Sequence, residues 1–317
     1  MNVLQCCREK IHTLVFFAAT FFVLPVSGAN TNGHRLLIGD DSKHRLAIVE
    51  RDGKISWEQP VNSIHDLALL RNGNILFQTN WTQLIEMTPD KKIVWSYDSA
   101  KMNGNEGKPV EVHAFQRLAN GSTMIVESGR ARIIEVNKNG ELQHEIKLRV
   151  QHPSPHSDTR MARKLDSGNY LVCQENDGVV REYNFNGEIV WEFPVPLFGK
   201  ERHAGHGPEA FGNAVFGALR LPNENTLIAT GNGHSLLEVT PAKEIIWSVH
   251  QDDLPGIKLA WLTTLDVLPN GNIVFGNCHA GPDNPQIIEI TKAKKVVWTF
   301  KDFEHFGNSL PASKIID

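Results

Sequence analysis

The chain has 317 residues, of which 41% are hydrophobic and 21% are charged, and its net charge is −4. This composition is typical of a soluble globular protein with one large domain or two small ones. The 32 basic residues are balanced by 36 acidic residues and form no concentrated run. Because nucleic-acid binding requires a concentrated basic face, we expect no nucleic-acid partner.

Residues 1–28 have the pattern of a secretory signal peptide. Arg8 and Lys10 precede an apolar run, and the small residues Gly28 and Ala29 follow it, which is the order of the basic, apolar and cleavage regions of such a signal. The run is interrupted by Pro25 and is short for a membrane span, which needs about 20 residues. We therefore predict a periplasmic or secreted protein with no stable membrane anchor, and an uncleaved anchor is the alternative.

Residues 29–317 repeat one sequence unit six times. Each unit has an apolar strand, a turn that is often Asn-Gly, a second strand, a third strand ending near a Glu, and a short turn into a fourth strand with Trp. Four short strands per unit, joined by hairpin turns, are typical of a β-propeller blade. We predict an all-β fold, a single six-bladed β-propeller domain, with an irregular β-sandwich as the alternative. The residues at the end of successive units are Trp57, Trp95, His144, Trp191, Trp247 and Trp298.

The two ends of this repeat array complement each other. The first unit begins at its second strand, residues 35–41, and residues 308–317 follow the last unit with no second strand after them. We predict that this C-terminal segment supplies the inner strand of the N-terminal blade, which closes the ring and covers strand edges that would otherwise be exposed. Cys173 and Cys278 fall in different blades, so we expect no disulfide between them.

Histidines gather at one predicted face of the propeller. Loops from one blade to the next share a face with the turns between second and third strands, and ten of the histidines fall in these segments. Loops on a rigid scaffold are where binding and catalytic residues concentrate. Histidine can bind a divalent transition metal or perform acid–base chemistry near neutral pH, and both chemistries stay open here. The ten are His44, His65, His113, His152, His156, His203, His206, His234, His279 and His305.

The longest connection between blades, residues 194–213, is the best single candidate segment for a site, because long loops in compact domains are often functional. It contains His203, His206, Glu209 and Asn213. Arg160 is a candidate anion contact, since a guanidinium matches carboxylate or sulfate with two hydrogen bonds.

The sequence thus yields three groups of candidate residues. The predicted catalytic residues are His113, His156 and His206, with Glu209 as their partner and Arg160 as the anion contact. The candidate metal ligands are His113, His156, His206 and His279. The candidate substrate contacts are His65, Arg130, Asn213, Trp261 and Thr264.

The units DGKISW and NGEIVW resemble the repeats of pyrroloquinoline-quinone (PQQ) propellers. The phrases IHDLALLRNGNILF and VHAFQRLANGSTMIV are similar to arylsulfotransferase-like bacterial propellers, a resemblance that implies sulfuryl transfer by a His on the channel face. The whole pattern is similar to secreted bacterial PQQ-binding-like propellers. Quinoprotein dehydrogenases have more blades and a vicinal Cys pair beside the quinone. The vicinal pair here, Cys6-Cys7, lies in the signal segment, which argues against a quinone cofactor.

These features predict an exported propeller with a His-rich ligand site at the mouth of its central channel. We expect an enzyme of transferase, lyase or hydrolase type that acts on a sugar-derived or aryl substrate, with a divalent metal as a candidate cofactor. A non-catalytic propeller that binds a saccharide or a protein through the same face is the alternative. A purely structural module explains the repeats but leaves the gathering of histidines unexplained.

Overall fold

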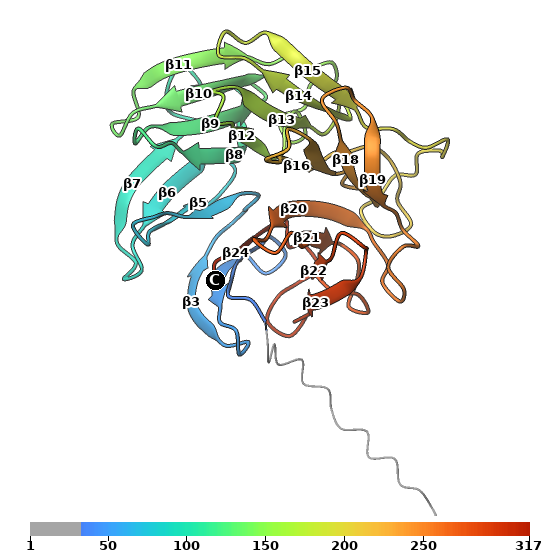
Figure 1. The fold of residues 1–317 in the computed structure, drawn as a ribbon. Coiled ribbons are helices and arrows are strands. Elements are labelled where there is room, and N and C mark those ends of the chain that lie inside the picture. Colours follow the sequence, from blue (N-terminus) through green and yellow to red (C-terminus); the bar gives the residue numbers. More distant parts are fainter. Residues whose placement is uncertain (1–32) are drawn as a thin grey trace, which may run out of the picture.

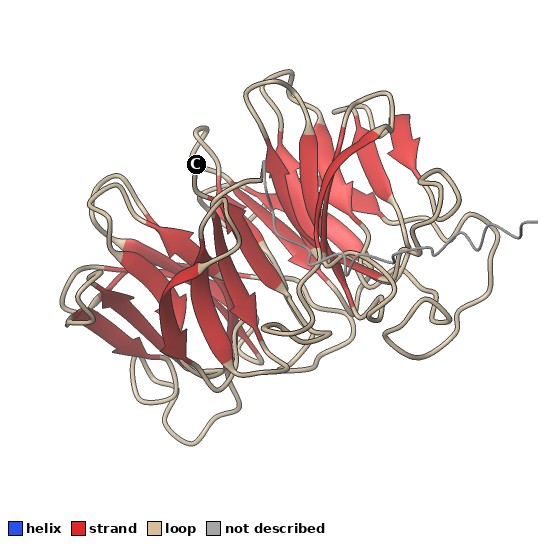
Figure 2. Cartoon of the chain, turned by 90° about the horizontal axis from the view of Figure 1, so that it is seen from below, coloured by secondary structure: helices blue, strands red, loops and turns tan. Residues whose placement is uncertain are grey.

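The computed structural model describes residues 33–317, and the predicted signal peptide, residues 1–28, lies outside the described residues. The described part contains no helix, and its strands form six antiparallel sheets of four strands each. Figure 1 shows these sheets arranged in a ring, and Figure 2 shows the loops gathered along its two edges. The prediction of an all-β, six-bladed propeller is confirmed.

The strands of each blade follow one another from the inner to the outer edge. Blade 1 consists of β24 (Ala312–Ile315), β1 (Leu36–Asp40), β2 (Arg45–Val49) and β3 (Ile55–Pro60). Blade 2 consists of β4 (Leu67–Leu69), β5 (Ile75–Gln78), β6 (Gln83–Met87) and β7 (Ile93–Asp98). Blade 3 consists of β8 (Glu111–Arg117), β9 (Thr123–Ser128), β10 (Arg132–Val136) and β11 (Leu142–Lys147).

The second half of the ring repeats the same order. Blade 4 consists of β12 (Ala162–Lys164), β13 (Tyr170–Gln174), β14 (Val179–Tyr183) and β15 (Ile189–Pro194). Blade 5 consists of β16 (Gly217–Arg220), β17 (Thr226–Ala229), β18 (Leu236–Val239) and β19 (Ile245–Val249). Blade 6 consists of β20 (Trp261–Val267), β21 (Ile273–Cys278), β22 (Ile287–Ile290) and β23 (Val296–Phe300).

The ring closes where the two ends of the described chain meet. β24 pairs antiparallel with β1, with Leu36 opposite Ile315 and Gly39 opposite Ala312. The backbone N–H of Gly307 donates to Asp40 Oδ2 at 2.6 Å, just before the paired segment begins. The predicted closure, in which the C-terminal strand completes the N-terminal blade, is therefore confirmed.

In blades 2 to 6, a Glu near the end of the third strand connects the blade to the next one. Glu86 in blade 2 accepts a hydrogen bond from Asn74 of its own Asn-Gly turn at 2.6 Å and from Arg117 of blade 3 at 2.8 Å. Hydrogen bonds between buried charged groups are among the stronger polar contacts in proteins. The equivalent contacts of the following blades join Glu135 to Lys164, Glu182 to Arg220, Glu238 to Lys292 and Glu289 to His34.

The aromatic residue that ends a unit also reaches the next blade. Trp57 Nε1 donates to the backbone oxygen of Pro89 at 3.1 Å, and Trp191 makes the equivalent bond to Pro241 at 3.1 Å. His144, which stands where the third Trp is expected, places its Nε2 2.9 Å from the backbone oxygen of Phe185. The substitution of His for Trp therefore preserves the link between blades 3 and 4.

Apolar side chains fill the space between the blades. Between blades 3 and 4, for example, Val126 and Ile133 pack with Tyr170 and Val172 in one buried cluster. Cys173 and Cys278 are both buried and free. None of the described residues forms a helix that could cross a membrane. The interior is therefore an apolar core interrupted by the polar contacts between blades.

Truncation after residue 307 tests the closure. We expect the shortened protein to lose its single cooperative unfolding transition, because β1 loses its partner and the ring opens. The measurement is thermal unfolding followed by circular dichroism. A variant with residues 308–317 replaced by a Gly/Ser segment of equal length should behave like the truncation, and a peptide of residues 308–317 should restore part of the transition. An unchanged melt of the truncated protein would disprove closure by β24.

Candidate functional site

The site begins at a β-bulge in the inner strand of blade 3. In the pairing of β8 with β9, Val112 faces Glu127 and Ala114 faces Val126, so His113 is an extra residue without a partner. Such a bulge re-aims the side chains around it. Glu111 precedes His113 by two positions, the spacing that places side chains on the same face of a strand.

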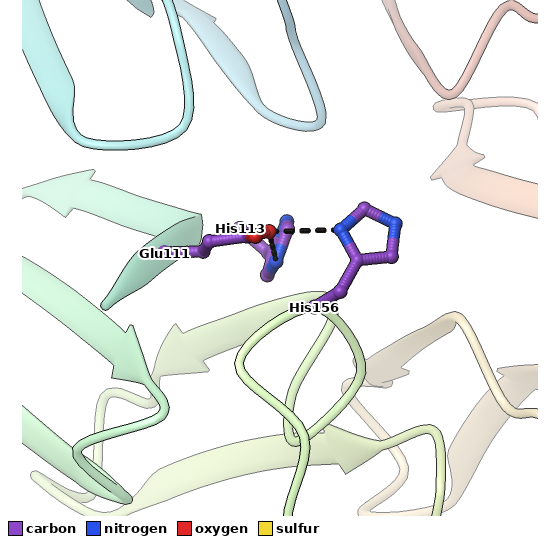
Figure 3. Close-up of side chains that lie close together, drawn as sticks. All are labelled: Glu111, His113 and His156. Atoms are coloured by element: carbon purple, nitrogen blue, oxygen red, sulfur yellow. Dashed lines mark hydrogen bonds and ion pairs between the residues drawn. The ribbon is translucent and has the colours of Figure 1, made fainter. Parts of the chain in front are cut away.

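Two histidines from other segments meet His113 and Glu111. His65 lies in the connection before β4, and its Nδ1 is 2.9 Å from Nδ1 of His113. His156 lies in the connection between β11 and β12, and its Nδ1 is 2.8 Å from Oε2 of Glu111. The same Oε2 is 3.2 Å from Nε2 of His113. Figure 3 shows Glu111 between His113 and His156. Blade 3 and the segments before blades 2 and 4 thus converge on one cluster.

Burial sets the charge states of this cluster. Burial lowers the pKa of His113 to about 3; Arg160 acts in the same direction, and the opposing contact with Glu111 does not restore it. Burial, together with Arg160 and His113, also lowers the pKa of His65 well below its usual value. Burial alone would raise the pKa of Glu111, but its contacts with His113 and His156 lower it to about 2. At neutral pH an ionised carboxylate therefore lies beside neutral imidazoles.

Aromatic rings surround His65. The ring of Trp81 meets it edge-on at 4.7 Å between centroids, and Phe216 lies 6.0 Å away on another side. Trp81 comes from the turn between β5 and β6, and Phe216 from the segment before β16. Flat apolar faces around a few polar atoms are typical of sites for small molecules.

A second group of rings continues from Phe216. Phe216 shares a buried cluster with Trp261, and Trp261 stacks on His206 at 5.0 Å between centroids. His279 lies 5.1 Å from His206. Burial and the neighbouring His206 lower the pKa of His279 to about 4. The predicted residues His206, His279 and Trp261 thus lie together, beyond Phe216 from the cluster of Glu111, His65, His113 and His156.

Arg160 holds the loop that carries His156. Its guanidinium forms an ion pair with Glu175, and it donates a hydrogen bond to the backbone oxygen of His156. Both Arg160 and Glu175 are buried, so the charge of each is matched inside the protein. The structure shows that Glu175 is the partner of Arg160 within the chain. The role of Arg160 as a contact for an anionic substrate stays a prediction.

The remaining predicted residues lie apart from the central cluster. Glu209 is exposed, and its carboxylate lies against Gly205 and Gly207 of its own loop. Asn213 donates to the backbone oxygen of Val195 at 3.3 Å. These contacts place the two side chains within the 194–213 connection.

Two further candidates also have partners within the chain. Arg130 donates to Asn105 Oδ1 at 3.0 Å. The hydroxyl groups of Thr264 and Ser313 are 2.7 Å apart and link inner strands β20 and β24. Their predicted contact with substrate stays untested.

Sequence reasoning missed Glu111, Trp81 and Phe216 as parts of this site. Glu111 could have been found from its position two residues before His113 on the same strand. Trp81 could have been found because it lies in a turn and not at the end of a unit, where the other repeat Trp residues lie. The pairing of Asp66 with Arg163, through two contacts of 2.8 Å, was also missed; it joins blades 2 and 4 across the inner strands.

A separate pocket lies on the loops around blade 5. It has a volume of about 250 Å³ and is lined by Phe198, Lys200, Phe211, Gly233, His234, His250 and Gln251. Burial lowers the pKa of His234 to about 4, and Lys200 acts in the same direction. The pocket therefore contains a further buried imidazole that is neutral at pH 7.

The sequence of residues 33–300 matches the family of the outer membrane protein assembly factor BamB, a PQQ-type repeat family. The chain belongs to this family. This membership agrees with the resemblance of the repeat units to PQQ-binding-like propellers. No curated protein is significantly similar to the chain.

Several solved structures share the fold. A protein of unknown function from Bacteroides caccae is 24% identical, with a TM-score of 0.73 over 88% of this chain and 97% of that chain. Streptogramin B lyase is 14% identical, with a TM-score of 0.58 over 88% of this chain and 86% of that chain. The extracellular domain of a putative hybrid two-component system from B. thetaiotaomicron is 15% identical, with a TM-score of 0.55. The match covers 89% of this chain and 36% of that chain. At these identities the likeness establishes the fold alone.

Replacement of Glu175 by Ala tests the support of the His156 loop. The variant leaves Arg160 buried without its carboxylate, which should reduce the free energy of unfolding by about 3–5 kcal/mol. Urea denaturation of the variant and the wild type gives the value. A double variant, Arg160→Met with Glu175→Leu, removes both charges and should recover most of the loss. Equal stability of the single variant and the wild type would contradict the buried pair.

His234→Gln tests the neutral imidazole in the smaller pocket. The folded pKa is about 4, below the unfolded value of about 6.5, so the unfolded state takes up the proton first as the pH falls. The wild type should therefore lose stability relative to the variant between pH 7 and pH 5, by about 1 kcal/mol after allowance for solvent screening. Urea denaturation at each pH measures this, with His44→Gln on the exposed surface as the control. A difference in the free energy of unfolding between wild type and His234→Gln that stays the same from pH 7 to pH 5 would refute the lowered pKa of His234.

Proposed function

We propose that the protein is an exported enzyme that binds a sugar-derived or aryl substrate at the mouth of the channel and exchanges a proton with it at His65. The observation that carries the proposal is the pair of imidazoles formed by His65 and His113, whose Nδ1 atoms are 2.9 Å apart. At that distance one nitrogen donates a hydrogen bond and the other accepts it. The pair therefore fixes the ring of His65 in one orientation.

The other nitrogen of His65 is available for chemistry. Its Nε2 has no hydrogen bond to any side chain or backbone group in the described part of the protein, and the residue is partly exposed. A neutral imidazole can accept a proton at this atom in one tautomer. In the other tautomer it can donate one while its Nδ1 takes up the proton that Nδ1 of His113 holds. Either direction of transfer suits a lyase or a hydrolase, in which a proton moves onto or off the substrate.

The surrounding rings support the class of substrate. Trp81 and Phe216 lie beside His65, and Trp261 lies beyond Phe216. Flat apolar faces of this kind pack against the faces of sugar rings and aryl groups. A solved structure with the same fold is that of a catalytically inactive His→Ala variant of virginiamycin B lyase from Staphylococcus aureus with quinupristin.

Export of the protein is supported by two observations. The first 28 residues carry the basic, apolar and small-residue pattern of a signal peptide. A solved propeller with the same fold is an extracellular domain, and the family is named for an outer membrane assembly factor.

The test compares the wild type with His65→Gln on a panel of aryl glycosides, oligosaccharides and aryl esters. His65→Gln keeps a polar side chain of similar length but cannot take up a proton. We expect kcat to fall by about 10²–10⁴ on any substrate that the wild type turns over, with KM little changed. His305→Gln, which replaces an exposed histidine that pairs with Asp302, is the matched control and should keep full activity.

The same experiment separates catalysis from binding. A wild type that binds saccharides from the panel in calorimetry without turning any of them over would refute the enzyme and favour the non-catalytic propeller. Equal turnover by His65→Gln and the wild type would refute the role of His65.

A further inference from the structure

We infer that Glu111, His113 and His156 form a binding site for one divalent first-row transition-metal ion at the mouth of the channel. The inference deepens the proposed function, because it assigns a cofactor to the same site. It also revises the ligand set expected from the sequence. The structure brings His113 and His156 together with Glu111, whereas His206 and His279 lie with Trp261.

The geometry of the three ligand atoms is close to that of a metal site. Oε2 of Glu111 lies 3.2 Å from Nε2 of His113 and 2.8 Å from Nδ1 of His156, and all three atoms lie within 4.8 Å of one another. Metal bonds of 2.0–2.2 Å place tetrahedral ligands about 3.3 Å apart. The pair with His113 already has this spacing, whereas the pair with His156 is about 0.5 Å shorter and would open slightly around an ion. The third pair can close by a rotation of His156, whose side chain is 52% exposed.

The environment of His113 points independently to a ligand. Its Nε2 is buried and has no hydrogen-bond partner among the described residues. The 3.2 Å approach to Glu111 is thus a close contact without hydrogen-bond geometry. A buried polar atom left unpaired is costly, and native proteins rarely keep one without a reason. A cation between Nε2 and the Glu111 carboxylate would satisfy this atom.

The second nitrogen of His113 has the support that metal-bound histidines usually have. In metal sites the ring nitrogen away from the ion donates to a neighbouring acceptor, which fixes the tautomer and the orientation of the ring. Nδ1 of His113 lies 2.9 Å from Nδ1 of His65, which can accept this hydrogen bond. The backbone of His156 is likewise held by Arg160.

The donor set selects the class of ion. Imidazole nitrogen suits zinc, iron, nickel and copper, whereas magnesium and calcium prefer sites made of oxygen atoms. Two histidines and one carboxylate are the three ligands of many catalytic zinc sites and of non-haem iron sites, which keep further positions open. Trp81 contacts both His65 and His156, so a substrate packed on Trp81 would lie beside the ion.

A bound ion would also decide the direction of proton transfer at His65. The ion occupies the lone pair on Nε2 of His113, so the ring proton of His113 resides on Nδ1 and is donated to Nδ1 of His65. The neutral ring of His65 then carries its own proton on Nε2, toward the mouth. No proton is gained or lost in this change of tautomers. The loaded site would therefore make His65 a proton donor: as Nε2 releases its proton to the substrate, Nδ1 takes the proton of His113, whose ring the cation would hold as an imidazolate. The empty site leaves both tautomer pairs accessible.

The test is titration of the chelator-treated protein with Zn²⁺ in a calorimeter, with metal analysis of the untreated protein. We expect one Zn²⁺ per chain. Glu111→Gln and His156→Ala should each weaken binding by at least about 100-fold, because each removes a ligand. His152→Ala, in the same loop and also exposed, is the matched control and should bind as the wild type does. Circular dichroism confirms that each variant is folded.

Two results would overturn the inference: no stoichiometric binding by the wild type, or equal binding by His156→Ala and the wild type. Co²⁺ gives a second readout, since coordination by the two histidines should produce a visible absorption band that His156→Ala lacks.

The outcome is separable from that of the proposed function. His65→Gln should keep the Zn²⁺ stoichiometry while losing turnover. Turnover without metal refutes the cofactor alone, and metal binding without turnover refutes the enzyme alone.

Discussion

The pairing of β24 with β1 is the contact on which the candidate site depends. The polypeptide joins each blade to the next, but no covalent bond closes the ring, so the arrangement of the blades is held by contacts between neighbours and by this closing pair. The closing strand is also fixed from the other side, where Lys314 pairs with Asp266 and Ser313 contacts Thr264 on β20. Because the cluster draws side chains from the segments before blades 2 and 4 and from blade 3, a ring that opens would separate its members.

Many of the residues that repeat in the sequence make contacts between neighbouring blades. In blades 2 to 6, a Glu near the end of the third strand meets a base of the next blade, and at several interfaces the Trp at the end of a unit reaches a backbone oxygen there. Contacts that recur in this way appear as a period in the sequence. At His144, Nε2 takes the place of the indole nitrogen.

The fold and its closure could be predicted because they rest on these repeated, local patterns. The site could be predicted only in part, because it rests on features that occur once. The bulge at His113 shifts the register of β8 and turns the side chain, and no single-sequence pattern marks it. The partner of Arg160 within the chain could not be predicted, because Glu175 follows β13 and reaches the guanidinium only once the blade has folded. The contact of the Glu209 carboxylate with Gly205 and Gly207 likewise depends on how the loop folds.

The arrangement at the mouth divides fixed residues from adaptable ones. His113 and Glu111 lie on an inner strand, and His65 is held against them by a hydrogen bond, so these three positions are set by the ring itself. His156 and His206 are exposed in long connections; the ring of His156 meets His113 edge-on, and His206 stacks on Trp261. Chemistry at a substrate atom requires fixed geometry, whereas recognition of the rest of a substrate tolerates movement. The reacting group of the substrate is therefore expected beside Glu111, His113 and His65, whose positions the strands fix. The part of the substrate that differs between ligands is expected beside Trp261 and His206, at the end of the mouth formed by loops.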